Sequence, residues 1–115
     1  MRCVPFYLTL LLALVVCAPG ANAQSISGVG ARPCRAFNLA LAQDSDAALD
    51  AYVSWAQGFI SAFNWSNVRA IDVSVDAGGI IQWLADYCGR APEVRVHTAL
   101  EHLVARSIAH PTDID

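Results

Sequence analysis

The first 23 residues have the layout of a secretory signal peptide, and this limits what the remaining chain can fold into. A short basic start precedes an uncharged apolar run from Val4 to Ala18, and the small residues 21–23 form a cleavage site. This run of about 15 residues is shorter than the roughly 20 that a membrane-spanning helix needs. We therefore predict cleavage after Ala23, a periplasmic or secreted protein, and no membrane span in the mature form.

Other fates of this segment stay open at this point. It could be retained as a membrane anchor or as a core helix, although its length disfavours the anchor. It could also be processed as a lipoprotein at Cys17, but the small residue that normally precedes such a cysteine is absent.

Export leaves one small domain with a single pair of cysteines. Removal of 23 of the 115 residues leaves 92, beginning at Gln24, which is the size of one domain. Two of the four cysteines belong to the signal, so Cys34 and Cys88 remain. A lone cysteine pair in an oxidising compartment predicts a disulfide, and closure of so long a loop contributes roughly 4 kcal/mol. Free thiols are the alternative, whereas a zinc site would need a second cysteine pair.

Charge and motifs argue against several classes of function. The mature part carries six arginines, ten acidic residues and no lysine, a net charge of −4, which makes it a poor nucleic-acid binder. The sequence has no phosphate loop, no HExxH and no G-x-S-x-G motif. His97 and Glu101 lie four residues apart without a third ligand at helical spacing, so we interpret them as a surface ion pair. We predict that the protein is not an enzyme and needs no cofactor or metal.

Apolar residues recur every three to four positions in four segments, which is typical of amphipathic helices. We therefore predict an all-α fold, a small four-helix bundle held by one disulfide. The expected helices are Cys34–Leu41, Asp46 to about Asn64, about Asp76 to Cys88, and Pro92 to about Ile108. Residues 24–33 are small and contain glycine, so we interpret them as a flexible leader and place the domain at 34–115.

Three local signals refine this picture. Ser74 or Asp76 predicts the N-cap of the third helix, and Asn64 predicts a C-terminal cap for the second. Gly58 lies inside the second helix, where glycine costs about 1 kcal/mol relative to alanine. We expect another backbone to approach Gly58 closely, because a side chain there would block such an approach.

Aromatic side chains provide the candidate binding surface. Trp55, Phe59, Phe63 and Trp83 are large apolar residues that could contact a protein partner or an unfolding client protein, and Trp65 belongs to the same aromatic set. The alternative interpretation is core, which a small exported domain favours because it needs every large apolar residue it has.

Three stretches of the sequence resemble a family of small periplasmic proteins. They are Cys34 with Phe37, then Trp55-x-x-Gly58-Phe59-Ile60-x-x-x-Asn64, and then Trp83-Leu84-x-x-Tyr87-Cys88 followed by Pro92. Together they resemble the proteins related to HdeA and HdeB over about residues 34–105, most of all uncharacterised relatives with W-x-x-G and W-L-x-x-Y-C elements. The resemblance implies a compact helical fold, one disulfide between an early and a late cysteine, and an acid-stress chaperone that holds unfolding clients. It leaves a homodimer open.

Charge gives this expectation a physical basis. At strongly acidic pH the carboxylates are neutral, so the arginines, the three histidines and the α-amino group bring the net charge to roughly +10. Self-repulsion would then loosen the domain while the disulfide keeps it compact. The alternative function is a periplasmic interaction protein, because small immunity proteins that neutralise secreted toxins are similar in their helical, single-disulfide layout. Such a protein would bind one partner tightly at neutral pH.

Overall fold

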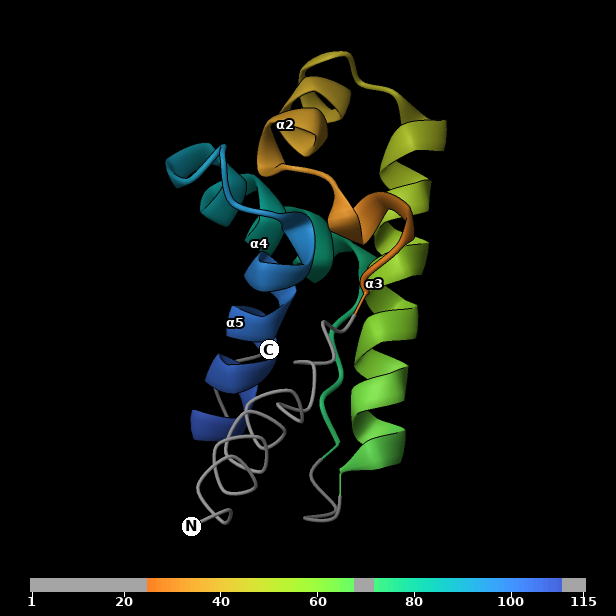
Figure 1. Cartoon of the computed structure of the whole chain (residues 1–115), viewed down its shortest axis with the longest axis vertical. Helices are drawn as coiled ribbons and strands as arrows, with labels where there is room; N and C mark the ends of the chain where they lie inside the picture. Colours follow the sequence, from red (N-terminus) through yellow and green to blue (C-terminus); the bar gives the residue numbers. More distant parts are fainter. Residues whose placement is uncertain (1–24, 68–71, 111–115) are drawn as a thin grey trace, which may run out of the picture.

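The structure is a computed structural model that describes residues 25–67 and 72–110. In these residues the chain forms a short 3₁₀ helix and four α-helices and contains no β-strand (Figure 1). The elements are η1 (Gly28–Ala31), α2 (Cys34–Ala42), α3 (Asp46–Ser66), α4 (Ala77–Arg90) and α5 (Val96–Ala109). The predicted all-α fold class is therefore confirmed. The predicted signal peptide lies outside the described residues.

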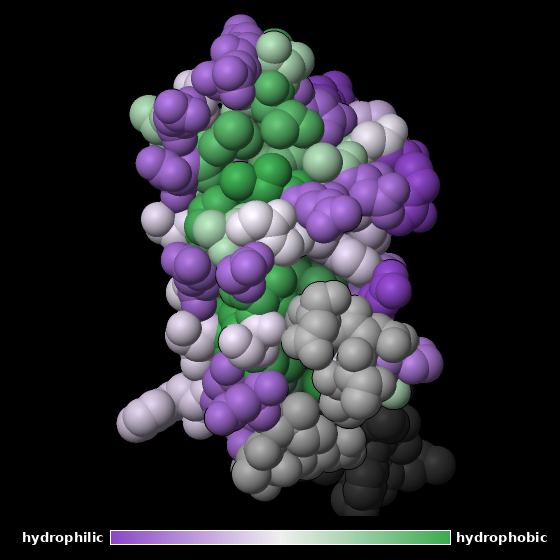
Figure 2. Space-filling view, turned by 180° about the vertical axis from the view of Figure 1, so that it is seen from behind, coloured by the Kyte–Doolittle hydropathy of each residue, from purple (hydrophilic) through white to green (hydrophobic). Residues whose placement is uncertain are grey.

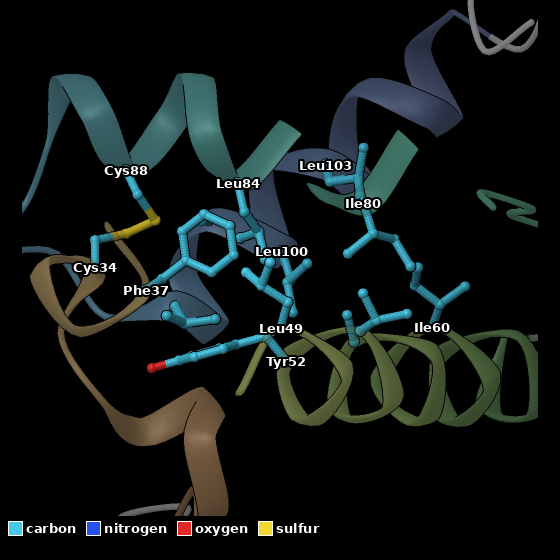
Figure 3. Close-up of a cluster of buried hydrophobic side chains, with 14 of the residues drawn as sticks. Cys34, Phe37, Leu49, Tyr52, Ile60, Ile80, Leu84, Cys88, Leu100 and Leu103 are labelled. Atoms are coloured by element: carbon cyan, nitrogen blue, oxygen red, sulfur yellow. A yellow bond between two sulfur atoms is a disulfide. The ribbon is translucent and has the colours of Figure 1, made fainter. Parts of the chain in front are cut away.

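Apolar side chains from the four α-helices meet in one core (Figure 3). The aromatic ring of Phe37 packs edge-on against Tyr52, with ring centroids 5.3 Å apart. The largest side chains that are fully buried are Phe37, Ile80, Leu84, Leu100 and Val96. Ser107 is the only buried polar residue in the described part of the chain, and its hydroxyl donates to the Leu103 carbonyl at 2.8 Å. Every aspartate, glutamate and arginine in the described ranges is exposed, so the core of these ranges holds no acidic or guanidinium group.

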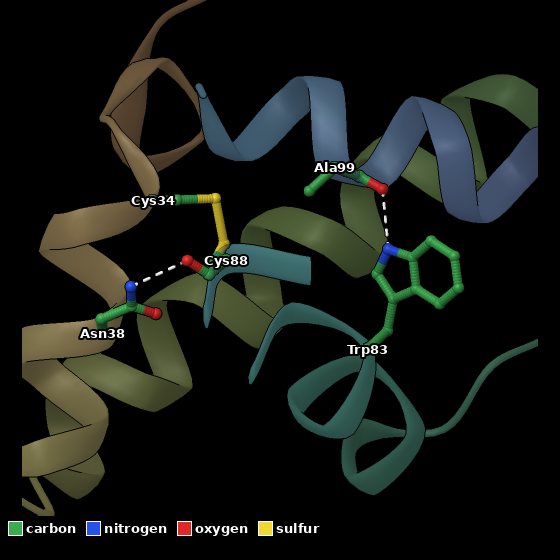
Figure 4. The surroundings of a disulfide bond; sticks show 5 residues. All are labelled: Cys34, Asn38, Trp83, Cys88 and Ala99. Carbon is green, nitrogen blue, oxygen red and sulfur yellow. Dashed lines mark hydrogen bonds between the residues drawn. A yellow bond between two sulfur atoms is a disulfide. The ribbon is translucent and has the colours of Figure 1, made fainter. Parts of the chain in front are cut away.

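The predicted disulfide between Cys34 and Cys88 is present and joins the first turn of α2 to the last turn of α4 (Figure 4). Both cysteines are fully buried, and their Cα atoms lie 4.9 Å apart. The side-chain amide of Asn38 donates to the Cys88 carbonyl at 2.9 Å, which fixes a second point of contact beside the sulfur bridge. The disulfide is therefore part of a packed joint between α2 and α4.

The last helix begins four residues later than its pattern predicts. Pro92 was expected in its first turn, but α5 starts at Val96. The carbonyls of Pro92 and Val94 accept hydrogen bonds from the backbone N–H groups of Arg35 and Cys34, at 2.8 and 2.7 Å. These N–H groups belong to the first turn of α2, where an N–H group has no acceptor within its own helix. The loop before α5 therefore stays non-helical, and its carbonyls cap the N-terminus of α2.

The interpretation of residues 24–33 as a flexible leader is wrong for η1, which packs against both α3 and α5. Gly30 is buried, and an antiparallel bridge between Pro33 and Arg95 ties the following residues to the loop before α5. The folded unit therefore begins ahead of Cys34.

The expectation for Gly58 is also wrong. Gly58 is exposed, and a Cβ atom built on it would meet no atom within 4 Å. Since no backbone approaches it, this glycine has no packing role in the described structure, and its place in α3 remains without a physical account.

Asn64 does not cap α3, because the helix continues to Ser66 and Asn67 follows as the C-cap. Its side chain instead pairs with the backbone of Val73 on both sides: Nδ2 donates to the Val73 carbonyl at 2.8 Å, and Oδ1 accepts from the Val73 N–H at 2.9 Å. This pairing ties the end of α3 to the segment that enters α4. The predicted N-cap is confirmed at Asp76, whose Oδ1 accepts from the Gly79 N–H at 2.7 Å.

Replacement of Asn64 by alanine is expected to lower the free energy of unfolding by about 1–3 kcal/mol, because two backbone groups of the buried Val73 lose their partners. Ser61→Ala, one turn earlier on the exposed side of α3, is the matched control and should change stability by less than about 0.5 kcal/mol. Urea denaturation of the two variants measures both values. Equal midpoints for Asn64→Ala and the parent protein would contradict a structural role for this pairing.

Candidate protein-binding surface

Three of the four predicted binding residues form one row on α3. Trp55, Phe59 and Phe63 follow each other at intervals of four, which places them on one side of the helix. The rings of Trp55 and Phe59 are stacked, with centroids 5.6 Å apart and an interplanar angle of 20°. All three side chains are half-buried and pack against the core. We call these three residues the aromatic row.

The helix around the aromatic row carries no charge. Asp50 is the last charged residue of α3, so residues 51–66 contain no acidic or basic side chain. The exposed positions of this stretch are small or neutral residues such as Ala51, Ser54 and Gly58. A surface of this kind offers apolar and hydrogen-bonding contacts whose strength does not depend on the ionisation of its own side chains.

Trp83 lies apart from the aromatic row and instead connects α4 to α5 (Figure 4). Its indole N–H donates to the Ala99 carbonyl at 2.7 Å, and the Arg106 guanidinium lies 5.7 Å from its ring centroid. Its other ring contact is Tyr87, on the same helix at 6.2 Å. The structure thus separates the predicted binding set into three residues that share a surface and one that does not join them.

Trp65, the remaining member of the aromatic set in the sequence, also lies outside the aromatic row. It is 93% exposed near the end of α3. It follows Phe63 by two positions, a spacing that puts a side chain on the opposite side of a helix. Figure 2 shows an apolar band between polar side chains on the face opposite the view of Figure 1. Leu39, Leu41 and Trp65 are the exposed large apolar residues of the part of the chain that the structure describes.

An open pocket of about 840 Å³ lies between the start of α4 and the end of α5. Its walls carry both signs of charge, with Asp76 and Asp86 on one side and Arg106 on the other. The nearby Ser107 hydroxyl is already bonded to the Leu103 carbonyl. The pocket combines no nucleophile with a base held beside it, and we assign no reaction to it.

The remaining polar candidates do not gather into a site. His97 Nδ1 lies 3.1 Å from Glu101 Oε1, the pairing that their spacing predicts. His102 stands edge-on to Tyr87 with ring centroids 5.3 Å apart. Residues 25–67 and 72–110 contain no group of three side chains that could hold a metal ion.

One cluster of positive charge was not predicted. The backbone bonds that cap α2 bring Arg32 and Arg35 next to the loop that contains Arg95. All three are exposed, and none has an ion-pair partner within the described ranges. Glu93 is the acidic residue of the same loop. Arg95 is far from Arg32 and Arg35 in the sequence, so only the fold reveals that these three positions lie close together.

No family model, no curated protein and no solved structure matches this chain. Of the helices that the structure describes, none combines the length and the apolar character that crossing a membrane requires.

Proposed function

We propose that the protein is an exported chaperone of the holdase type, which binds unfolding proteins at acidic pH and keeps them from aggregating. The observation that carries the proposal is the aromatic row on an uncharged stretch of α3. Unfolding proteins expose apolar segments, and half-buried aromatic rings are well suited to bind them. The HdeA-like sequence elements are consistent with this role.

Such a protein must not lose its fold when its carboxylates become protonated, and the exposure of these carboxylates favours this. All described carboxylates are exposed, so their protonation changes the surface and leaves no charge buried without a partner. The ion pair between Arg90 and Asp86 would be lost, but both side chains are 68% exposed and such pairs contribute little. The disulfide does not titrate and continues to hold α2 to α4.

Acid also reverses the sign of the net charge of the protein. The described acidic residues become neutral while the arginines stay charged, so the protein turns from weakly negative to strongly positive. Positive charge keeps a complex of chaperone and client soluble through repulsion between complexes. The aromatic row keeps its character in acid, because residues 51–66 contain no carboxylate, histidine, lysine or arginine.

The test is an aggregation assay at pH 2–3 and at pH 7, in which light scattering follows an acid-sensitive client protein. The parent protein is expected to suppress scattering at acidic pH, and Trp55→Ala should lose at least half of that effect. Trp83→Ala is the matched control, because it truncates the same side chain outside the aromatic row and should retain the suppression. Melting curves of both variants at the assay pH separate binding from stability. An absence of suppression by the folded parent protein would end the proposal.

The arginine cluster favours a second candidate, an interaction protein that binds one acidic partner at neutral pH. Arg32, Arg35 and Arg95 are free to form charge-assisted bonds with carboxylates on that partner. In a pull-down at pH 7, this function predicts one stoichiometric partner that is lost when the three arginines are replaced by serine. Recovery of the same partner by the triple variant would count against it.

A further inference from the structure

Residues 25–31 form a strap that lies over Trp55. The Ser27 carbonyl accepts a hydrogen bond from the indole N–H of Trp55 at 2.9 Å. Gly30 sits directly against the indole, since a Cβ on it would stand 2.2 to 2.4 Å from three atoms of the ring system. Gly28 has a φ of +75°, a conformation that glycine adopts without strain. At Ser27, Gly28 and Gly30 the strap thus meets Trp55, the first residue of the aromatic row, through its backbone.

The strap contributes little to the core of the bundle. None of its side chains belongs to the buried apolar cluster, and Val29 only packs against the edge of that cluster. Its C-terminal end is anchored by the bond from the Val96 N–H to the Arg32 carbonyl and, two residues later, by the disulfide. Displacement of the strap would therefore uncover Trp55 while the core and its anchor stay in place.

We propose that the strap occupies, within its own chain, the groove in which α3 binds segments of client proteins. The inference rests on the proposed function and names the chemistry of the ligand. The ligand is an extended, uncharged stretch of polypeptide with a glycine, or another residue of minimal bulk, against the indole. One of its backbone carbonyls accepts the Trp55 N–H in place of Ser27. A client binds by exchanging with the strap.

The groove selects such a ligand for physical reasons. The indole N–H needs an acceptor when the ring is covered, and a backbone carbonyl is available in any unfolded chain. The contact distances at Gly30 exclude a branched side chain at that position. Neither the strap nor residues 51–66 carry a charge, so the ligand gains nothing from ionised groups at this groove.

The experiment compares two glycine variants that each add one methyl group. Gly30→Ala forces the strap away from Trp55, whereas Gly58→Ala places its methyl group in open space. The probe is a fluorescent peptide with the sequence of residues 25–33, SISGVGARP, and fluorescence anisotropy reports its binding. The disulfide-bonded protein with Gly30→Ala is expected to bind the peptide at least tenfold more tightly than the parent protein. Gly58→Ala should bind like the parent, and Trp55→Ala added to Gly30→Ala should abolish the gain.

Each result decides between the two proposals. Equal peptide affinities of the two glycine variants would overturn the groove, as would a Gly30→Ala protein that no longer folds by circular dichroism, because the strap would then be indispensable to the fold. Suppression of aggregation without peptide binding by Gly30→Ala would leave the chaperone function and remove the groove. Peptide binding without suppression of aggregation would leave the groove and remove the chaperone function.

Discussion

Replacement of Phe37 by alanine is expected to lower the free energy of unfolding by about 3–5 kcal/mol. Phe37 is fully buried, and Figure 3 shows its ring among side chains from the other helices, beside the disulfide. Its edge-on contact with Tyr52 joins α2 to α3. Truncation removes this contact and leaves a cavity at the point where the helices meet. Small domains have a total stability of about 5–15 kcal/mol, so the loss is a large part of the whole.

Leu39→Ala is the matched control, because Leu39 is on the same helix but 58% exposed. It should change the free energy of unfolding by less than about 0.5 kcal/mol. For a domain of this size, the Phe37 variant should melt more than about 10 °C below the control in differential scanning calorimetry. Melting temperatures of the two variants within two or three degrees of each other would contradict the burial of Phe37 in the core.

Removal of the disulfide is expected to cost roughly 4 kcal/mol, by the chain-entropy estimate for a loop of 54 residues. The double variant Cys34→Ala and Cys88→Ala removes the bond without leaving buried thiols. Thermal melts at neutral and acidic pH measure the loss, and the effect should matter most at acidic pH, where repulsion between arginines adds to it.

The parent protein treated with a reducing agent provides the comparison, since it lacks the bond but keeps both cysteines. It should melt close to the double variant. If oxidised and reduced proteins melted together, the joint between α2 and α4 would be held by its packing and by the bond from Asn38 alone.

Apolar periodicity sufficed to predict the four α-helices, because each buries one side against a common core. Cysteine counting sufficed for the disulfide once two cysteines had been assigned to the signal peptide. The beginning of the last helix could not be predicted in the same way. Pro92 and Glu93 are good residues for a helix start, but the first turn of α2 takes the carbonyls of this loop. A contact between distant segments thus overrides a local preference.

The candidate site shows the same limit. Spacing along α3 predicts that Trp55, Phe59 and Phe63 share a side, but it cannot show that residues 25–31 cover Trp55. The two glycines of the strap resemble those of an unstructured linker, and only the position of Trp55 explains why Gly30 has no side chain. Gly58, which the pattern singled out, has open space around it. The meaning of a glycine depends on neighbours that are distant in the sequence.

The disulfide also divides the chain topologically. Residues 34–88 become a closed ring that contains α2, α3 and nearly all of α4, whereas η1 and α5 belong to two arms that leave the ring. The arms meet beside the closure, where the Val96 N–H bonds to the Arg32 carbonyl. Ring closure restricts the unfolded ring but not the arms, so the strap and α5 depend on their non-covalent contacts to stay in place. Trp55 is therefore part of the covalent ring, and the strap that covers it is part of an arm.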